Sequence, residues 1–540
     1  MKVVVLGAVA AGTKTAAKLK RECAAAEVEI YTKGSQISYA GCGLPYYLSG
    51  VIARKEQLTV NTPESFEKAT GVRVHVQREA VHVDPARNEL TVQSPDGSQE
   101  TVSYDKLVIA TGARPFVPPI EGTELNNVFT LRTPQDAIAI RTAIEEQGLK
   151  RVCVVGAGFI GLEIAENLAA SGVRVSVIEA ADQILTPFDP EMAEYIDRHL
   201  AEMGIMTFTG VRVEKIEGQD QVEKVVTSRR AMKCDAVILA AGIRPNTEFL
   251  QGSGIELNPD RTIRVNAHLQ TNIPNIYAAG DCVSVVNRMT GQDQWFAMGS
   301  TANLEGRLLG QTLAGNDKTY HGSLGTAIVK LGTLSAARCG LNEKQCQHNG
   351  LEAQSVLAVT EDHAGYYPDA RMLMIKLIAE KKTGRLLGVQ IVGSSNVDKC
   401  VDIVVMALAM KASVADLLDI DFAYAPPYST AIHPVVLAAQ LLDNKMSGRL
   451  CSINPGQLTE TLQKATLVDV SSTPSLPGHP YFDYTAMDPS ALALDENQTA
   501  VLVCNRGRKA YLTQNRLRQA GIDNTVVLEG GTQFTPLQEE

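Results

Sequence analysis

Apolar runs followed by glycine turns predict strand–helix–strand units of the kind found in parallel sheets. Residues 2–6 form a mostly apolar strand, as expected where both faces of a sheet are covered. A glycine turn at 7–12, a helix over 13–25 and a strand over 28–32 follow. The first and last glycines of this turn permit tight packing, and the helix N-terminus favours a pyrophosphate.

A second unit has the complete dinucleotide-binding pattern. A strand at 152–155 leads to Gly156-Ala157-Gly158-Phe159-Ile160-Gly161, a helix over 162–171 and a strand over 173–178 that ends at Glu179. An acid at this spacing accepts hydrogen bonds from the ribose hydroxyls of NAD and repels a 2′-phosphate. No Lys or Arg follows in the next several positions. The sequence therefore predicts NADH rather than NADPH.

Further strand–glycine endings organise the middle of the chain. They occur at 104–112, 236–242 and 276–281. Two glycine turns about 150 residues apart, each with its own strand–glycine ending, indicate two nucleotide-binding folds, one inserted in the other.

Composition and charge narrow the classes of function. The chain has 540 residues, 45% apolar and 20% charged, which is typical of a globular protein of several domains. A net charge of −10 argues against nucleic acid as a partner. Ten cysteines without a C-x-x-C pair favour neither disulfides nor a metal site, and indicate a reducing, cytoplasmic compartment. No apolar run approaches about 18 residues, so no membrane partner is expected.

One cysteine stands between two glycines in Ser38-Tyr39-Ala40-Gly41-Cys42-Gly43-Leu44-Pro45-Tyr46-Tyr47. A free cysteine is often an inert core residue, but flanking glycines leave room for a flat or bulky group to approach the sulfur. No second cysteine is close in sequence. Cys42 is therefore either a core thiol or a lone redox thiolate that pairs with an external sulfur or oxygen.

Lys14, Lys18 and Arg21 share one face of the first helix. They form either a solvated face or a site for the phosphates of a large thiol substrate.

A second candidate cysteine follows a buried strand near the C-terminus. Cys504 opens the basic loop Cys504-Asn505-Arg506-Gly507-Arg508-Lys509, and a helix follows. Backbone amides and the helix N-terminus favour an anion in such a loop, and its cations lower the pKa of a thiol. A phosphatase loop would require arginine where the chain has Ala510. The pattern predicts a persulfide carrier.

The order of these motifs resembles the FAD- and NAD-dependent disulfide reductases. The turn at 7–12, Ala110-Thr111-Gly112, the turn at 156–161 and Tyr277-Ala278-Ala279-Gly280-Asp281 follow one another as in that superfamily. The resemblance implies that the first unit binds FAD and the second NADH. The cofactor-binding residues are then Gly7, Gly12, Lys33, Thr111, Gly112, Arg132, Gly156, Gly158, Gly161, Glu179, Gly242 and Asp281.

Within the superfamily the chain resembles coenzyme A-disulfide reductases and NADH-dependent persulfide reductases, which use one cysteine. NADH oxidases and peroxidases carry a histidine where this chain has Ala10. The resemblance implies a homodimer whose tyrosines reach the partner's cysteine. It gives Cys42, Tyr366, Tyr367, Tyr424, Tyr428 and Cys504 catalytic roles, and coenzyme A contacts to Lys14, Lys18, Arg21 and Ser38. The C-terminal unit resembles a rhodanese domain, with Lys509 at the usual loop arginine.

We therefore expect an α/β protein with two Rossmann-like domains, an α+β dimerisation domain and a small rhodanese-like domain. The expected divisions are 1–112 with 242–320 for FAD, 113–241 for NAD, 321–447 for dimerisation, a linker at 448–465, and 466–540 for the rhodanese-like domain. The expected function is NADH-dependent reduction of CoA disulfide, CoA persulfide or polysulfide. The alternatives are an NADH oxidase or peroxidase, and a flavin-bound sulfur-trafficking or sensing protein without fast turnover.

Overall fold

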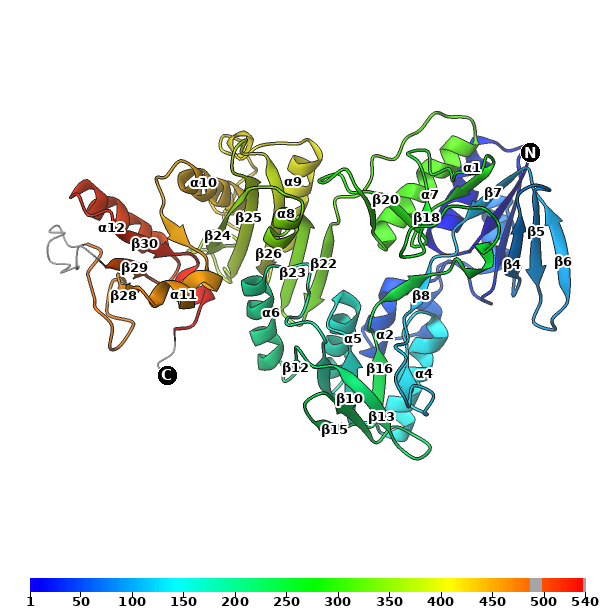
Figure 1. Ribbon diagram of the computed structural model, residues 1–540, viewed down its shortest axis with the longest axis horizontal. Coiled ribbons are helices and arrows are strands. Elements are labelled where there is room, and N and C mark those ends of the chain that lie inside the picture. Colours follow the sequence, from blue (N-terminus) through cyan, green and yellow to red (C-terminus); the bar gives the residue numbers. More distant parts are fainter. Residues whose placement is uncertain (486–497, 538–540) are drawn as a thin grey trace. The chain divides into compact units, whose positions relative to one another are not determined.

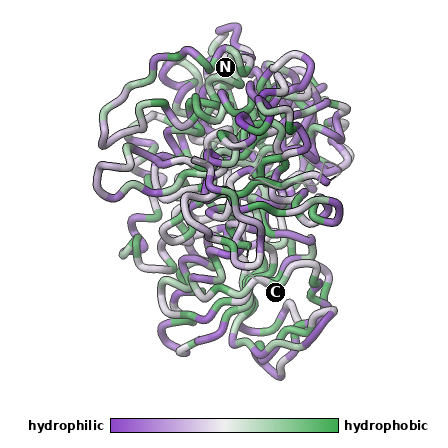
Figure 2. Tube along the Cα trace, turned by 90° about the vertical axis from the view of Figure 1, so that its left-hand side faces the viewer, coloured by the Kyte–Doolittle hydropathy of each residue, from purple (hydrophilic) through white to green (hydrophobic). Residues whose placement is uncertain are grey.

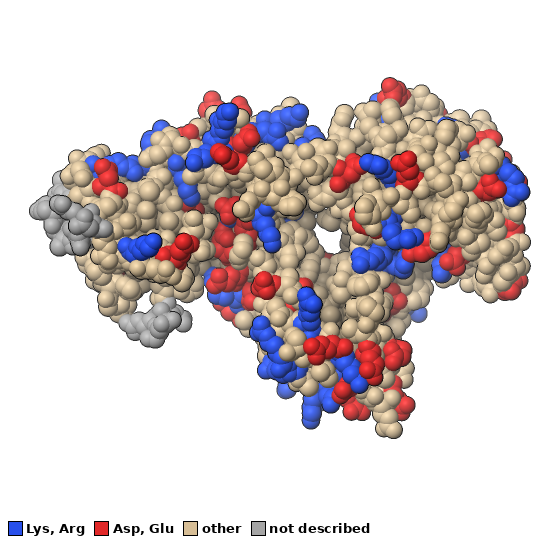
Figure 3. Space-filling view, viewed as in Figure 1, with Lys and Arg blue, Asp and Glu red and all other residues tan. Residues whose placement is uncertain are grey.

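The computed structural model of the chain describes residues 1–485 and 498–537 (Figure 1). Its contacts divide the chain into two units, Met1–Asp182 with Met203–Ser323, and Gln183–Glu202 with Leu324–Glu540. Apolar stretches, green in Figure 2, run through the interior. Acidic and basic side chains are interspersed on the face drawn in Figure 3. Within the described residues, no helix has the length and apolar character needed to cross a bilayer.

The first sheet of unit 1 is parallel, in the order β19-β7-β1-β2-β3. Its strands are β1 (Lys2–Leu6), β2 (Glu27–Thr32), β3 (Arg73–Val76), β7 (Lys106–Ile109) and β19 (Ile276–Ala278). Helix α1 (Ala10–Glu22) follows the first glycine turn, three residues earlier than predicted, and packs against α7 (Gly299–Leu313). The first predicted strand–helix–strand unit is therefore confirmed.

The second sheet of unit 1 is also parallel, in the order β12-β11-β10-β16-β9. Its strands are β9 (Val128–Phe129), β10 (Arg151–Val155), β11 (Arg174–Ile178), β12 (Met206–Phe208) and β16 (Ala236–Leu239), with α5 (Phe159–Ala170) between β10 and β11. The chain leaves and re-enters the first fold through β8 (Ala113–Pro115) and β17 (Ile243–Pro245), which pair antiparallel. One nucleotide-binding fold is thus inserted in the other, as predicted.

Unit 2 is built on an antiparallel sheet in the order β22-β23-β26-β25-β24. The strands are β22 (Ala327–Leu331), β23 (Leu334–Gly340), β24 (Ala353–Glu361), β25 (Met372–Glu380) and β26 (Leu386–Gly393), and helices α9 (Val397–Ala409) and α10 (Pro434–Met446) pack on it. Helix α6 (Pro190–Glu202) also belongs to this unit. This placement differs from the predicted division, in which residues 113–241 form the NAD-binding domain.

The C-terminal segment forms a parallel sheet in the order β27-β30-β29-β28. The strands are β27 (Ser452–Ile453), β28 (Ala465–Asp469), β29 (Thr499–Val503) and β30 (Thr525–Leu528), and the helices are α11 (Leu458–Leu462) and α12 (Arg508–Gln519). Since β27 and α11 lie within 448–465, that segment is part of the sheet's domain and not a linker. Residues 486–497 and 538–540 of the predicted rhodanese-like domain lie outside the described residues.

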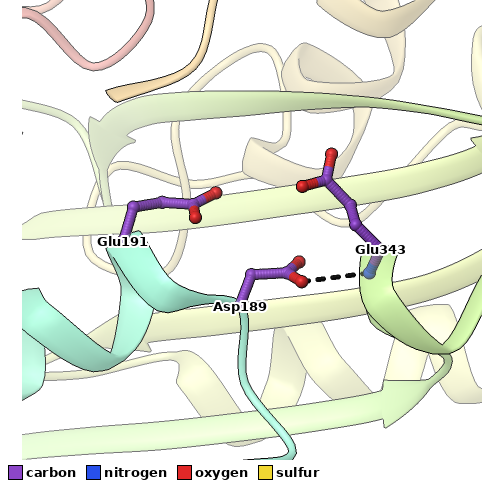
Figure 4. A group of neighbouring side chains, drawn as sticks. All are labelled: Asp189, Glu191 and Glu343. Atoms are coloured by element: carbon purple, nitrogen blue, oxygen red, sulfur yellow. Dashed lines mark hydrogen bonds between the residues drawn. The ribbon is translucent and has the colours of Figure 1, made fainter. Parts of the chain in front are cut away.

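A buried charge cluster holds α6 to the antiparallel sheet. Lys376 on β25 is fully buried, and its Nζ lies 2.9 Å from Asp189 Oδ2, 2.9 Å from Glu343 Oε2 and in contact with Glu191 Oε1. Figure 4 shows the three carboxylates facing one another, with the Glu343 amide donating to Asp189 at 3.0 Å. Three acids this close have the donor set of a cation site, but the lysine ammonium already occupies it.

Candidate active site

Cys42 lies on an exposed turn that leads into a short helix. It sits in the 3₁₀ turn Gly41–Gly43, directly before α2 (Leu44–Leu48). A side chain on Gly41 would meet no atom within 4 Å, whereas one on Gly43 would lie 3.1 Å from the Ile52 side chain. Gly41 therefore leaves open space, whereas Gly43 lies in close contact with the Ile52 side chain. The exposure favours the redox interpretation of Cys42 over the core thiol.

The protein groups around Cys42 oppose ionisation of its thiol. Partial burial of the sulfur raises its pKa, and the charges of Glu163 and Asp281 raise it further. The guanidinium of Arg132 acts in the opposite direction but does not outweigh them. An ionised Cys42 would therefore need stabilisation from a group other than these residues.

A hydrogen-bond network that the sequence analysis missed connects α2 to α5. Tyr46 Oη donates to Glu163 Oε1 at 3.1 Å, and Ser49 Oγ donates to Asn167 Oδ1 at 2.6 Å. Burial raises the pKa of Glu163. Polar residues within an otherwise apolar helix are the signal that could have revealed these contacts. The network ties the cysteine-bearing turn to the inserted fold within unit 1.

The predicted FAD residues gather at one edge of the first sheet. Most of them follow the carboxyl ends of β1, β2, β7 and β19, which meet at the same edge because these strands are parallel. A Cβ on Gly7 would lie 2.1 Å from Ala110 O, and one on Gly12 would lie 1.9 Å from Gly7 O. Both positions thus require glycine, so the turn keeps the tight cradle that a pyrophosphate needs.

Side chains at this edge form fixed contacts. Arg132 Nη2 donates to Asp281 Oδ2 at 3.1 Å, and Thr111 Oγ1 donates to Asn246 O at 2.7 Å. Gly112, with φ of 67°, lies next to the Arg132 guanidinium. Lys33 forms an exposed ion pair with Glu79 at 3.0 Å, so its predicted cofactor contact would require a change of partner.

The second glycine turn has the geometry of a nicotinamide dinucleotide site. Gly156 has φ of 109°, and side chains at Gly156 or Gly161 would overlap backbone atoms. Glu179 accepts hydrogen bonds from Ala157 N at 2.7 Å and Ala181 N at 2.9 Å. Its carboxylate therefore lies against the turn where a ribose is expected. Gly158 precedes α5, and Gly242 follows β16 in open space.

The basic stripe on α1 is partly neutralised. Lys18 forms an ion pair with Glu22, and this contact lowers the pKa of the Glu22 carboxyl. Arg307 on α7 also lowers it, so α7 adds a cation that the sequence analysis did not include. Arg21 is exposed and Lys14 is partly buried. The remaining predicted CoA residue, Ser38, has φ of 48° and accepts a hydrogen bond from Asn61 Nδ2 at 3.2 Å.

The predicted tyrosines lie in unit 2. The hydroxyls of Tyr366 and Tyr424 are 3.0 Å apart, and both rings are exposed. The hydrogen bond to Tyr424 raises the pKa of Tyr366. Tyr367 packs edge-on against His363, and Tyr428 is exposed. Two exposed phenols from separate segments thus form a hydrogen-bonded pair.

The Cys504 loop has the predicted shape but different charge contacts. Cys504 follows β29 and is buried, and Gly507, with φ of 83°, precedes α12. Arg506 pairs with Glu361 at 3.0 Å, outside the loop. Lys509 contacts Ser472 Oγ. In this structure Arg506 and Lys509 therefore have partners other than the Cys504 sulfur, and their predicted effect on that sulfur stays a prediction.

Comparisons with known proteins match most of the chain. The pyridine nucleotide-disulphide oxidoreductase family matches residues 1–302, and its dimerisation domain matches 326–436. A Methanocaldococcus jannaschii protein named NADH oxidase is 36% identical over 83% of this chain and 100% of its own length. A Pyrococcus horikoshii protein named NAD(P)H coenzyme A polysulfide/persulfide reductase is 33% identical over 82% of this chain and 98% of its own.

Two solved structures extend through the C-terminal segment. The NAD-dependent persulfide reductase from A. fulgidus aligns with a TM-score of 0.95 and 34% identity, over 99% of this chain and 100% of its own. Reduced Bacillus anthracis CoADR-RHD aligns with a TM-score of 0.94 and 31% identity, over 99% and 97%. Both alignments therefore reach beyond the two matched family regions.

Proposed function

The chain belongs to the pyridine nucleotide-disulphide oxidoreductase family, and from that premise we propose that it reduces CoA persulfide, polysulfide or CoA disulfide with electrons from NADH. The observation that carries the proposal is Cys42, an exposed thiol on a turn flanked by the Arg132–Asp281 pair and Glu163. All ten cysteines of the chain are free. A lone thiol suits chemistry in which the second sulfur comes from the substrate.

The residues at the first sheet's edge fit FAD. The backbone turn at Gly7 and Gly12, where side chains would not fit, would hold the pyrophosphate of FAD. Asp281 would contact the flavin-bearing half of the cofactor. When bound, FAD supplies the passage of an electron pair from NADH to a sulfur centre. The second turn and Glu179 would hold NADH.

Cys42 carries the sulfur chemistry in this proposal. Its thiolate attacks the outer sulfur of the substrate, so that one S–S bond forms as another breaks and the second thiolate leaves. Tyr366 and Tyr424 can donate hydrogen bonds to that leaving anion. Because they lie on the dimerisation domain, we infer that a second copy of the chain supplies them and that the working form is a homodimer.

Coenzyme A is the proposed carrier of the substrate sulfur. Its phosphates would contact Lys14, Lys18 and Arg21, with Lys18 exchanging Glu22 for phosphate, and Ser38 would lie near the thiol arm. Names of the relatives that mention coenzyme A support this choice.

The C-terminal domain is the proposed source of sulfane sulfur. A parallel sheet, a cysteine at the end of a central strand and a helix that starts after a glycine are the parts of a rhodanese-like carrier. Cys504 would receive sulfur and pass it to coenzyme A. A fused carrier favours persulfide or polysulfide over plain CoA disulfide.

The test is anaerobic NADH oxidation by the full chain with CoA persulfide, polysulfide, CoA disulfide, peroxide, and thiosulfate plus coenzyme A, with a separate aerobic assay for oxygen, all repeated with the Cys504→Ser variant. We expect sulfur acceptors to exceed peroxide at least about tenfold, and Cys504→Ser to slow turnover only where sulfur must first be loaded from thiosulfate. Faster peroxide or oxygen turnover would favour the NADH oxidase name of the M. jannaschii relative. Bound FAD that NADH cannot bleach would favour a sensing role.

Glu179 is expected to set the preference for NADH. Glu179→Gln keeps a hydrogen-bond acceptor at the turn but removes the charge that repels a 2′-phosphate. The ratio of kcat/KM for NADH to that for NADPH should fall about tenfold. The control is Glu146→Gln, an exposed glutamate of the same unit. An unchanged ratio would show that another group selects the coenzyme.

A further inference from the structure

Arg506, two residues after Cys504, has its partner on a neighbouring sheet. Its Nη1 donates to Glu361 Oε1 at 3.0 Å and lies 3.9 Å from Met372 Sδ. Glu361 is the last residue of β24, and Met372 is the first of β25. A cation of the Cys504 loop is therefore held by a carboxylate outside that loop.

Glu361 also supports the turn that carries the tyrosines. A Cβ on Gly365 would lie 2.6 Å from Glu361 Oε2, so the carboxylate packs directly against the Gly365 backbone. Tyr366 is the next residue, and its hydroxyl pairs with that of Tyr424. One carboxylate thus contacts both the Arg506 side chain and the root of the tyrosine turn.

The C-terminal domain is anchored without Arg506. Glu529, at the end of β30, is buried and accepts hydrogen bonds from Leu357 N at 2.8 Å, from Ser452 Oγ at 2.6 Å and from Lys445 Nζ. Arg506 can therefore change partner while the domain stays attached to β24.

We propose that Arg506 is shared, pairing with Glu361 while Cys504 carries no extra sulfur and with the sulfane-sulfur anion once Cys504 is loaded. The inference rests on the proposed role of Cys504 as a sulfur carrier. A guanidinium pairs readily with either anion. Glu361 is then a positioning residue that restrains the Arg506 guanidinium. When Cys504 is loaded with sulfur, Arg506 leaves Glu361, and the contact of Glu361 with the tyrosine turn is loosened.

The loading step is balanced without another reactant. The Cys504 thiolate attacks the outer sulfur of thiosulfate, a new S–S bond forms, and sulfite leaves with the electron pair of the broken bond. Cyanide then removes the outer sulfur as thiocyanate and restores the thiolate. Both steps can be measured in the full chain.

Other charged groups near the loop have partners of their own. The Asp469 carboxylate at the end of β28 accepts from the amides of Ser471, Ser475 and Leu476. Glu529 is paired with Lys445. Lys509 contacts Ser472 and lies 5.1 Å from the centre of the Tyr484 ring. Arg508 is exposed beside Lys509. Glu361 is therefore the carboxylate that competes for Arg506.

Glu361→Gln tests this competition. Without the carboxylate charge, Arg506 is available to a Cys504 anion in every state. The pH midpoint for alkylation of Cys504 by iodoacetamide, followed on its peptide by mass spectrometry, should fall by about half a unit. Sulfur transfer from thiosulfate to cyanide below that midpoint should rise about threefold, because half a unit corresponds to that change in thiolate.

The double variant distinguishes sharing from a general disturbance. In an Arg506→Met background, Glu361→Gln should have no further effect on the pH midpoint for alkylation of Cys504. If Arg506→Met lowers the thermal midpoint of the protein, Arg506→Gln is used as the background instead. Asp443→Asn, which removes an exposed ion pair with Arg449 in the same unit, should leave the midpoint unchanged. An unchanged midpoint in Glu361→Gln, or a shift that persists without Arg506, overturns the inference. Absence of thiosulfate transfer in the wild type would instead overturn the carrier role.

Discussion

Replacing Cys42 with serine is expected to lower NADH-dependent turnover of CoA persulfide and CoA disulfide by at least about a thousandfold. A hydroxyl cannot form the mixed disulfide, and it is hardly ionised at neutral pH. The cradle of Gly7 and Gly12 is untouched, so FAD should remain bound and NADH should still bleach it. Anaerobic initial rates and the flavin spectrum measure the two effects separately.

The matched control is Cys451→Ser, since Cys451 is the other exposed cysteine of the chain and lies in unit 2. Its turnover should stay within about twofold of wild type, because it has no proposed role. Sulfur-acceptor turnover that survives Cys42→Ser would contradict the assignment of the redox centre. A loss of FAD in that variant would show that the turn also shapes the flavin site.

Lys376→Met is expected to cost about 3–5 kcal/mol of stability in unit 2, because it leaves two buried carboxylates and the partly exposed one of Glu343 without their cation. The carboxylates raise the pKa of Lys376. Burial raises the pKa of Glu191, whereas at Glu343 the lysine charge outweighs burial and lowers the pKa. The thermal midpoint of unit 2 should fall by about 10 °C, as measured by calorimetry.

The loss of stability caused by Lys376→Met should increase as the pH rises. Without the ammonium, burial raises the folded-state pKa values of Glu191 and Glu343 above their unfolded values. Such groups contribute stability below the unfolded pKa and lose it as pH rises. The difference from wild type should therefore be smaller at pH 5 than at pH 8. Lys381→Met, at an exposed lysine beyond β25, is the control. An equal loss at both pH values would point to packing instead of charge.

Local patterns were sufficient to locate the repeated folds. Strands β1 and β10 begin within one residue of their predicted starts, because a continuous apolar run before a glycine turn has few alternative structures. The glycine turns and the position of Glu179 could be predicted from the sequence for the same reason. Their chemistry depends on neighbours a few residues away, which the sequence displays directly.

Contacts between distant segments could not be predicted. Glu361 lies 145 residues before Arg506, and no periodicity connects a strand end to a loop in another sheet. The Tyr46–Glu163 contact spans 117 residues, and the same limit applies there. By contrast, the Lys18–Glu22 pair has i,i+4 spacing, so its neutralising effect on the basic stripe could have been read from the sequence.

The placement of α6 has a consequence for synthesis of the chain. Glu191 cannot pair with Lys376 until the ribosome has added the 185 residues that separate them. Their synthesis takes roughly 10 to 40 s at ribosomal rates. During that time the apolar face of the helix, with Met192, Ile196 and Leu200, has no sheet to cover it. The nascent chain therefore exposes an apolar surface until β25 has been synthesised, and a chaperone that shields this helix should raise the yield of folded protein.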